Sequence, residues 1–401
     1  TLQEVNPETV EQKINGSELD TTRKIFNNPP KSTLNVALML PLYLSEVDQI
    51  RINPRGSNTR TVVRPFSFIS FYEGAALAAQ AFEDEKVKIN VHVFDIAEDA
   101  NAAVRLINSG RLNDVDIIIG PLFARSFEVM SDFAKQREIF IINPFSERDD
   151  ILIDNPYVIK INPSERIQLQ SLLNYVVKDN VEQKIVIVSN DSLPNEKERT
   201  EQTKLFFETH CEHLETPVFF DISKERFQTL NNRLSGIKPN AIIYLSNSQA
   251  FATEILTQVS RRESLSGNTL YCLHKLPQLE LMELQFLNDL QTHYATSLFV
   301  EYTNEQVKNF DRLFFETYQT IPTIPDATPH NNAYVGYDVM SYVLQLLKIG
   351  NTNYGNILET MPYKGFHNTI RLERSNPLQG LENKNVNILK IENSRLKRVN
   401  N

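Results

Sequence analysis

Strand-like apolar runs alternate with amphipathic helix-like segments along most of this chain, and that rhythm constrains its fold more than any other feature. Leu34–Leu40 predicts a buried strand, and apolar residues recur at spacings of three and four from Phe68 to Phe82, which predicts a helix over 68–86. We predict further strands over 88–96, 115–119 and 138–142, separated by helices over 98–109 and 123–137. This βαβαβαβ series is typical of a doubly wound parallel sheet in an α/β protein, with right-handed crossovers.

A second series begins near Tyr157. We predict strands over 157–161, 184–189, 218–221, 241–246, 269–273 and 293–300. Helices are predicted over 164–178, 196–213, 224–235 and 248–262, followed by late helices over 305–318 and 331–348. Alternation in 387–392 predicts a short antiparallel finish. Two such series in 401 residues fit two or three domains.

The composition excludes several function classes. The chain has 41 Lys and Arg against 50 Asp and Glu, a net charge of −9, whereas a general nucleic-acid binder needs a basic face. No two of the 12 glycines are separated by one residue, so G-x-G-x-x-G does not occur, and neither the P-loop string nor G-x-S-x-G is present. We therefore predict no nucleic-acid partner, no phosphate-cradling loop and no α/β-hydrolase nucleophile.

Cysteine use and apolar runs say little about the compartment. Cys211 and Cys272 are too few for a disulfide scaffold and do not form a C-x-x-C pair. The longest apolar run, Val36–Leu44, has nine residues, whereas a spanning helix needs about 20, so no transmembrane segment is predicted. The chain begins at Thr1 rather than Met, and we expect any signal peptide or lipid anchor to lie outside it.

Ligands of open α/β sheets bind beyond the carboxyl ends of the strands, where helix N-termini present free N–H groups. The residues that follow the predicted strands are therefore candidate ligand contacts: Tyr43, Phe123, Arg125, Ser126, Phe145, Ser146, Arg148, Asn190, Asn247, Ser248 and Lys275. This mixture suits a small polar molecule stacked on an aromatic wall. The alternative is that the phenylalanines belong to the core and the polar residues cap helices. No cofactor is predicted.

Six strings in the chain carry a resemblance to a known family: NVALMLPLY, FYEGAALAAQAF, VHVFDI, DVDIIIGPLF, IINPFS and NPYVIKINPSERIQLQSL. In this order they resemble the type I periplasmic binding proteins, and the branched-chain amino-acid receptor branch is nearest. The resemblance runs over residues 34–395 and comes closest to bacterial envelope proteins that pair this domain with LysM modules. No complete LysM module is present, although LQEVNPE at 2–8 resembles a remnant of one.

The resemblance implies two doubly wound parallel-sheet lobes joined by three crossover segments. After an extended lead-in over 1–33, lobe one would comprise 34–155 plus 303–361, and lobe two 163–295 plus 365–399. The hinges would lie near 156–162, 296–302 and 362–364. It also implies a non-catalytic solute-binding domain of the periplasm or cell envelope, like those of ABC transporters, with its ligand in a cleft.

Departures from the family pattern change the expected ligand. Ala124 stands where amino-acid receptors of the family usually have a hydroxyl residue for the ligand carboxylate, and Lys275 stands where they offer an acid for the ammonium. A lysine about 4 Å from an ammonium is unfavourable by about 4 kcal/mol at an effective dielectric near 20. We therefore expect a small polar or anionic ligand rather than a free α-amino acid. The alternative is an interaction module for an envelope protein or peptidoglycan, with a degenerate cleft.

A long insertion, Leu44–Ser67, carries Arg51, Arg55, Arg60 and Arg64 and has no acid after Asp48. Loops of this length are uncommon in compact domains. Local positive charge on an acidic protein predicts contact with an anionic partner. The alternative is a solvated loop.

Enzyme chemistry finds little support. His210 and His213 share a helix face, but two ligands do not make a metal site, so no metal is predicted. None of the seven histidines lies in a recognisable nucleophile context. We predict that the chain is not an enzyme.

Overall fold

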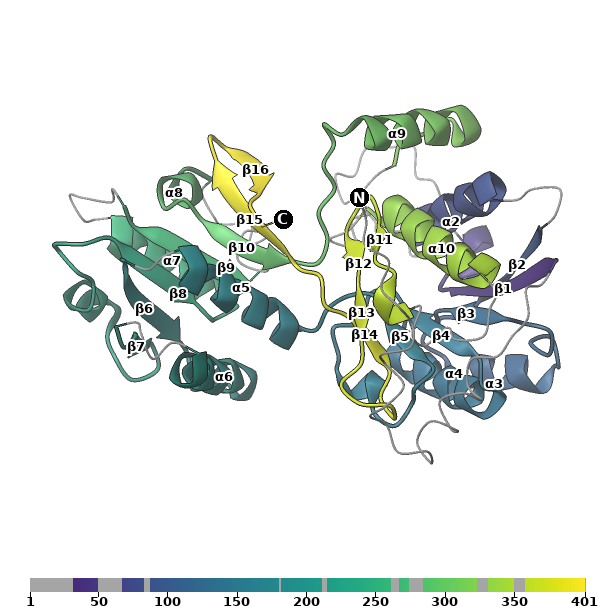
Figure 1. The fold of residues 1–401 in the computed structure, drawn as a ribbon, viewed down its shortest axis with the longest axis horizontal. Coiled ribbons are helices and arrows are strands. Elements are labelled where there is room, and N and C mark those ends of the chain that lie inside the picture. Colours follow the sequence, from purple (N-terminus) through teal and green to yellow (C-terminus); the bar gives the residue numbers. More distant parts are fainter. Residues whose placement is uncertain are drawn as a thin grey trace, which may run out of the picture. The chain divides into compact units, whose positions relative to one another are not determined.

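The computed structural model describes residues 32–49, 67–82, 87–179, 182–210, 215–260, 267–273, 284–322, 331–349 and 358–400. They form two compact units, which we describe separately. Unit 1 holds the described residues up to Asn162 together with Val300–Lys384, and unit 2 holds Pro163–Phe299 with those from Asn385 onward. Each unit is built on one seven-stranded sheet with helices on both faces (Figure 1). The predicted α/β class with two doubly wound sheets is confirmed.

Sheet A of unit 1 has the strand order β13-β14-β5-β4-β3-β1-β2. The strands are β1 Thr33–Leu40, β2 Lys88–Asp95, β3 Ile117–Ile119, β4 Phe140–Asn143, β5 Val158–Lys160, β13 Leu372–Glu373 and β14 Leu381–Asn383. β14 runs parallel to β5, and β13 is antiparallel to β14. The apolar residues of β1, β3, β4 and β5 are buried, except the half-buried Phe140 at the start of β4, as expected for parallel strands covered on both faces.

Two pairs of helices cover sheet A. Helices α2 (Ile69–Phe82) and α10 (Asn332–Ile349) lie on one face, and α3 (Ala100–Asn108) and α4 (Ala124–Arg137) lie on the other (Figure 1). α9 (Glu305–Tyr318) packs on α2 and α10 through an aromatic cluster. The remaining elements of unit 1 are the 3-10 helices η2 Leu44–Gln49 and η4 Asp150–Leu152, and the hairpin β11 Tyr363–Lys364 with β12 Thr369–Ile370.

Helices α2 and α10 approach closely because each has a glycine at the crossing. A Cβ atom built on Gly74 would lie 1.9 Å from the Ala333 carbonyl oxygen, and one built on Gly336 would lie 2.1 Å from the Phe71 carbonyl oxygen. Side-chain carbons do not come this near to a backbone atom. Each glycine therefore leaves room for the backbone of the partner helix.

Sheet B of unit 2 has the strand order β16-β15-β10-β9-β8-β6-β7. The strands are β6 Lys184–Ser189, β7 Val218–Asp221, β8 Asn240–Tyr244, β9 Thr269–Leu273, β10 His293–Thr296, β15 Asn387–Glu392 and β16 Arg395–Arg398. β15 and β16 are antiparallel additions at one edge. The helical elements are α5 Glu165–Asp179, α6 Pro194–His210, η5 Phe227–Asn232, α7 Gln249–Ser260 and α8 Leu284–Asp289.

Alternate residues of sheet B build two apolar cores. Val186, Val188 and Ile242 join a cluster with α7, η5 and α8, whereas Ile185 and Ile187 join a cluster with α5 and α6. Because side chains of a strand point to opposite faces in turn, one continuous apolar run fills both cores.

Three predictions about the connections need correction. The helix predicted over 224–235 is a six-residue 3-10 helix, η5, whose Asn231 and Asn232 are poor helix formers. The predicted strand over 293–300 ends at Thr296, because the Thr296 hydroxyl accepts the Leu298 N–H at 3.3 Å and turns the chain. In the described segment over 297–304 no strand follows.

The third correction concerns the last passage between the units. It was predicted near 362–364, but it lies between Lys384 and Asn385, because β14 pairs with β5 inside sheet A. The Asn383 side chain holds this arrangement: its Oδ1 accepts the Arg371 N–H at 2.8 Å, and its Nδ2 donates to the Thr369 carbonyl at 3.1 Å. The first two passages, after Asn162 and after Phe299, fall within the predicted segments 156–162 and 296–302.

Candidate functional site

Each sheet has one point where its strand order reverses direction. In sheet A, β1 lies between β2 and β3, and in sheet B, β6 lies between β7 and β8. Ligands of open α/β sheets bind beyond the carboxyl ends of the strands at such points. We call the loops after β1, β3 and β4 (41–44, 120–125 and 144–148) edge 1. We call the loops after β6 and β8 (190–193 and 245–248), with the first turn of α6, edge 2.

Tyr43 on edge 1 is held by two carboxylates. Asp95 at the end of β2 accepts the N–H groups of Leu42, Tyr43 and Leu44 at 2.8–3.0 Å. This grip fixes Tyr43 in the left-handed region, with φ 49°. The Tyr43 hydroxyl donates to Glu98 Oε1 at 2.9 Å, so this predicted ligand contact already has a partner in the protein.

The turn after β3 positions the start of α4. Gly120 has φ +83°, and a Cβ atom there would lie 2.2 Å from the Met39 carbonyl oxygen, so only glycine fits. Phe123 is the half-buried N-cap of α4, and Arg125 in the first turn is exposed. Ser126 is fully buried, and its hydroxyl donates to the Ala97 carbonyl at 2.8 Å, which ties α4 to the loop after β2.

Asn143, at the end of β4, builds the next turn. Its Oδ1 accepts the N–H groups of Phe145 and Ser146 at 3.1 and 2.8 Å. The Phe145 ring packs against Phe68 and Phe71, with centroids 6.1 and 5.8 Å apart. The ring is half-buried, so it combines a core contact with an accessible edge. The half-buried Ser146 accepts the Arg148 N–H at 3.2 Å.

Arg148, predicted to meet an anionic ligand, is paired with an acid of its own loop. Its Nε donates to Asp150 Oδ1 at 2.9 Å. This hydrogen bond lowers the pKa of the Asp150 carboxyl. Arg148 and Arg125 are both exposed, but Arg125 has no hydrogen bond or ion pair within the described residues.

Lys160 lies fully buried at the end of β5, beside edge 1. Its Nζ is 2.9 Å from Glu382 Oε1 on β14 and 3.1 Å from Asp149 Oδ1. Burial opposes ionisation of Glu382, but Lys160 and Lys384 together lower its pKa to about 2. This network was not predicted from the sequence, although a lysine within the apolar run VIKI is a usable signal.

Edge 2 begins with an acidic turn after β6. Asn190 is buried, and its Oδ1 accepts both the N–H and the hydroxyl of Ser192. The Asp191 N–H donates to Asp221 Oδ1 at 3.2 Å. Burial opposes ionisation of the Asp221 carboxyl, but hydrogen bonds from Lys224 and Ser223 outweigh this effect and lower its pKa. The Asp221 carboxylate at the end of β7 thus holds the loop after β6 in place.

The first turn of α6 grips the loop after β8 from two sides. Glu196 Oε1 accepts the Asn247 N–H at 3.0 Å, and Arg199 Nη1 donates to the Leu245 carbonyl at 2.8 Å. Ser248 lies in the same loop, and its carbonyl accepts the Tyr244 hydroxyl at 3.0 Å. The structure therefore brings the predicted contacts Asn247 and Ser248 next to Glu196, which the sequence analysis did not select. Its only signal was an acid in the first turn of a helix that follows a strand.

Several predicted site residues lie outside the described part of the chain. They are Lys275 and the arginines of the insertion, Arg51, Arg55, Arg60 and Arg64. The same holds for His213 and Cys211. Contacts proposed for these residues stay predictions.

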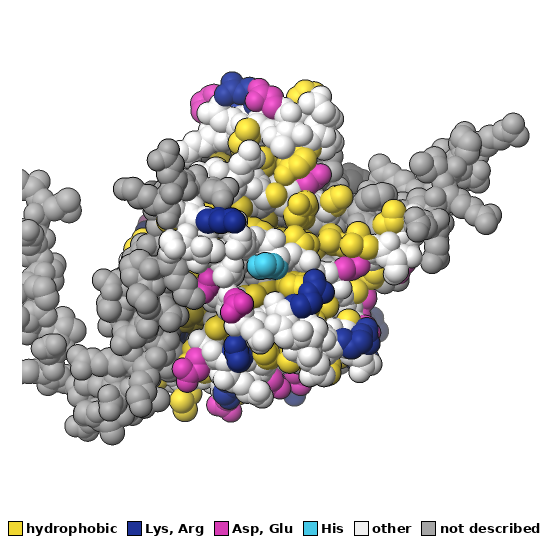
Figure 2. Space-filling model, turned by 90° about the vertical axis from the view of Figure 1, so that its right-hand side faces the viewer, with side chains coloured by type: hydrophobic (Ala, Val, Ile, Leu, Met, Phe, Trp, Pro, Cys, Tyr) yellow, Lys and Arg dark blue, Asp and Glu magenta, His cyan; other side chains and the backbone are white. Residues whose placement is uncertain are grey.

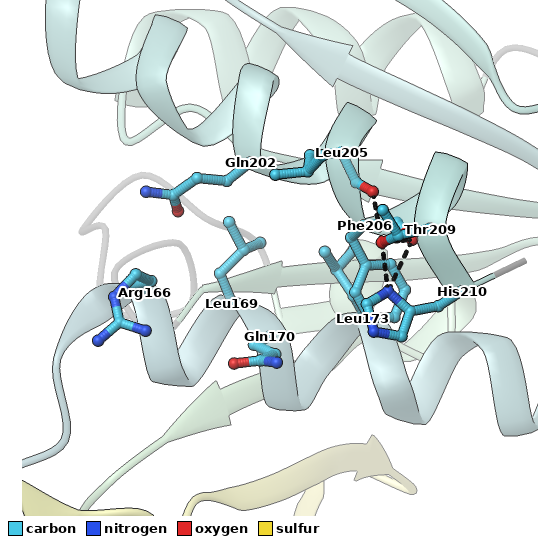
Figure 3. Close-up of a pocket in the computed structure, with 9 residues that line it drawn as sticks. All are labelled: Arg166, Leu169, Gln170, Leu173, Gln202, Leu205, Phe206, Thr209 and His210. Carbon is cyan, nitrogen blue, oxygen red and sulfur yellow. Dashed lines mark hydrogen bonds between the residues drawn. The ribbon is translucent and has the colours of Figure 1, made fainter. Parts of the chain in front are cut away.

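A separate groove of about 350 Å³ lies between α5 and α6 of unit 2 (Figure 3). Its apolar lining comes from Leu169, Leu173, Leu205 and Phe206, and none of the predicted ligand contacts lines it. His210 at one end stacks on Phe206 with centroids 5.0 Å apart, and its Nδ1 lies 2.6 Å from the Thr209 hydroxyl. Within the described residues, no three His, Cys, Asp or Glu side chains are arranged to hold a metal.

The described surface shows no tract of one charge on the face seen in Figure 2, where acidic and basic side chains are interspersed among hydrophobic ones. Such a face does not provide the continuous basic stripe that nucleic-acid backbones require. No described helix combines the length and the apolar character needed to cross a membrane. Cys272 is a free, buried thiol, and burial raises its pKa.

Comparison with known proteins identifies a family and structures of similar fold. A family model described as periplasmic binding protein matches residues 60–374. Among curated proteins, no sequence matches this chain significantly. A solved structure of a putative branched-chain amino acid ABC transporter protein from Rhodospirillum rubrum is 15% identical, with a TM-score of 0.65 over 92% of this chain and 100% of that one.

Two further solved structures are similar in fold. A branched chain amino acid ABC transporter periplasmic ligand-binding protein from Burkholderia xenovorans LB400 is 12% identical, with a TM-score of 0.59 over 92% of this chain and 94% of that one. An ABC transporter substrate-binding protein from Desulfitobacterium hafniense in complex with Leu is 12% identical, with a TM-score of 0.56 over 92% and 100%. At these identities the likeness is one of fold.

Proposed function

This chain belongs to the periplasmic binding protein family, and from that premise we propose that it binds a small polar or anionic solute in the manner of ABC-transporter binding proteins. The prediction that it is not an enzyme is confirmed by this membership. The observation that carries the proposal is the placement of polar groups at both strand-order reversals, on edge 1 and edge 2.

The ligand class follows from which groups remain available. On edge 1, Tyr43 and Arg148 are engaged by Glu98 and Asp150, whereas Arg125 is exposed in the first turn of α4. A guanidinium at a helix N-terminus favours an anionic group. The half-buried Phe145 and Phe123 supply the apolar wall. We infer a ligand with a carboxylate or a similar anion. The leucine bound by one structural relative is not assigned to this chain.

Calorimetry with sugars, carboxylates and amino acids tests this proposal, together with mass spectrometry of small molecules released from protein purified from its native host. We expect a carboxylate to bind, and Arg125→Ser to weaken it by about tenfold or more. Lys135→Ser, which removes a cation at the other end of α4, is the matched control and should bind as the parent does. Tight binding of a free cationic amino acid would contradict the proposal.

A second candidate is an interaction module of the cell envelope. The groove between α5 and α6 favours it, because Leu205 on its wall is 61% exposed and no carboxylate lines it. Under this candidate the groove takes an apolar side chain of an envelope protein. Leu205→Asp would then abolish capture by that partner while solute binding stays unchanged. Loss of solute binding in this variant would count against two independent surfaces.

Export and domain pairing are also part of the proposal. Membership of the family supports a periplasmic or envelope location. Pairing with LysM modules is inferred only from the strings quoted above. Fractionation that found the full-length protein in the cytosol would refute the location.

A further inference from the structure

Glu196 on edge 2 has a buried carboxylate, and one of its two oxygens accepts no hydrogen bond from the described residues. The residue is 5% exposed, and its Oε1 accepts the Asn247 N–H, whereas its Oε2 is buried and has no hydrogen-bond partner in the described part of the chain. Buried polar groups in proteins are nearly always hydrogen-bonded, because an unpaired one costs free energy. An unpaired carboxylate oxygen at a functional position therefore calls for a donor.

The nearest cation does not supply that donor. Arg199, one turn further along α6, is 6% exposed and directs its Nη1 to the Leu245 carbonyl oxygen. Its Nε contacts Glu165 of α5. Among the ion pairs of the described residues, none includes Glu196. Within the segments that the structure describes, the charge of Glu196 is thus offset only by the Asn247 amide and by the N-terminal end of α6.

The position of Glu196 points to a ligand rather than to a core role. Its carboxylate bridges the first turn of α6, which follows β6, and the loop after β8, the two sides of the strand-order reversal in sheet B. On the loop after β6, Asp191 Oδ1 also lacks a hydrogen-bond partner. Edge 2 therefore offers two acceptors that no donor among the described residues satisfies.

We propose that Glu196 is a specificity-determining residue, whose Oε2 accepts a hydrogen bond from a hydroxyl or ammonium group of the solute. The proposal rests on the solute-binding function argued above and deepens it, because it names the chemical group that edge 2 of unit 2 would recognise in the solute. Sites built around a buried polar group reject analogues that lack the matching group, since binding them leaves the buried group unpaired.

Matched probe triplets test this: propionate, lactate and alanine, with the corresponding sets that carry an isobutyl or a benzyl side chain. Within each set the molecules differ only in having no donor, a hydroxyl or an ammonium. Calorimetry is performed on the parent, on Glu196→Gln, which keeps the Oε1 acceptor, and on Glu198→Gln, an exposed acid of the same helix. Thermal unfolding of each ligand-free protein is measured in parallel.

We expect the parent and Glu198→Gln to prefer a hydroxy acid or an amino acid over the plain acid by about tenfold or more, and Glu196→Gln to lose that preference. The hydroxy and amino arms identify which donor is used. A preference that survives in Glu196→Gln overturns the inference and leaves the proposed function standing.

The ligand-free proteins give an independent check. Unfolding of Glu196→Gln should occur within about 2 °C of Glu198→Gln or above it, because an amide is easier to bury than a carboxylate. A midpoint several degrees lower would show that Glu196 serves the fold, and would overturn the inference. If the parent binds no probe and carries no native solute, the proposed function fails, and the inference fails with it.

Discussion

The two units build the same parallel sheet but use polar groups differently. In unit 1, three predicted ligand residues, Tyr43, Ser126 and Arg148, are bound to Glu98, Ala97 and Asp150, and a buried lysine is paired across sheet A. In unit 2, the sheet core is apolar on both faces, and unpartnered acceptors remain at edge 2.

This difference suggests a division of labour. Polar groups with protein partners fix loop geometry, so under the proposed function edge 1 would be a preorganised wall that presents Arg125 and the phenylalanines. Buried acceptors without protein partners can be satisfied by a ligand, so under the same proposal edge 2 would discriminate between solutes. If this comparison is correct, the stability of unit 1 should be sensitive to single substitutions at its close helix crossing and in its buried ion-pair network.

The largest expected effect is at the α2–α10 crossing of unit 1. Gly74→Ala places a Cβ atom 1.9 Å from the Ala333 carbonyl oxygen, so the helices must separate, and we expect a loss of more than about 3 kcal/mol in the free energy of unfolding. Urea unfolding followed by helix circular dichroism measures it. Gly236→Ala in unit 2 meets no atom within 4 Å and is the control, with an expected change of about 0.5 kcal/mol or less. Equal effects at both positions would show that the α2–α10 crossing does not depend on a glycine.

Next in size is the buried lysine. Lys160→Met leaves Glu382 and Asp149 without their shared cation, which should cost about 3 kcal/mol, since the buried Glu382 carboxylate then keeps its pair with Lys384 but loses the buried one. Amide hydrogen exchange locates the effect, and we expect faster exchange in β5 and β14 but not in sheet B. Lys308→Met removes an exposed pair with Glu305 on α9 and should change stability by about 0.5 kcal/mol or less. Unchanged protection of β5 would show that the network adds nothing to sheet A.

The same network predicts an acid-sensitive unit 1. The pKa of Glu382 is lowered from 4.5 to about 2, so the unfolded chain takes up a proton first as the pH falls. The stabilisation is complete above about pH 5 and declines toward pH 2, with a loss of about 2 kcal/mol by pH 3. Unfolding measured between pH 6 and pH 3 in the parent and in Glu382→Gln checks this. The variant should be less stable near neutral pH and show a flatter dependence. Parallel curves would exclude Glu382 as the cause.

Sequence patterns predicted the sheets better than the site, for a physical reason. Burial of a strand or helix leaves a local period of two or 3.6 residues, so segments such as Leu34–Leu40 and 305–318 were placed within a residue or two. The pairing of Lys160 with Glu382, and of Glu196 with Asn247, joins residues far apart in sequence and leaves no periodic trace. The last passage between the units was predicted near 362–364 for the same reason: the pairing of β14 with β5 joins distant segments, and the short, partly polar β14 shows no pattern that predicts it.

The rule that places ligands at carboxyl ends of strands selects loops, but it does not separate side chains that already have partners in the protein from side chains that are available to a ligand. Ser126 illustrates this, because its position after β3 suggested a ligand contact, whereas its hydroxyl is buried against the Ala97 carbonyl. Whether it also contacts a ligand stays a prediction.

The smallest predicted effect is that of Ser126→Ala, which tests whether the Ser126 hydroxyl contacts a ligand. Ser126→Ala removes the donor to the Ala97 carbonyl, which lies 2.8 Å away in the core, and we expect a loss of about 1 kcal/mol in stability with solute affinity unchanged within about twofold. Ser146→Ala is the matched change on the same edge: its half-buried hydroxyl accepts only the Arg148 N–H among the described hydrogen bonds, so stability should change little while affinity falls. Urea unfolding and calorimetry on both variants separate the two roles. If Ser126→Ala instead weakened binding about tenfold with its stability intact, edge 1 would hold an available hydroxyl after all, and the contrast between a committed edge 1 and a discriminating edge 2 would fail.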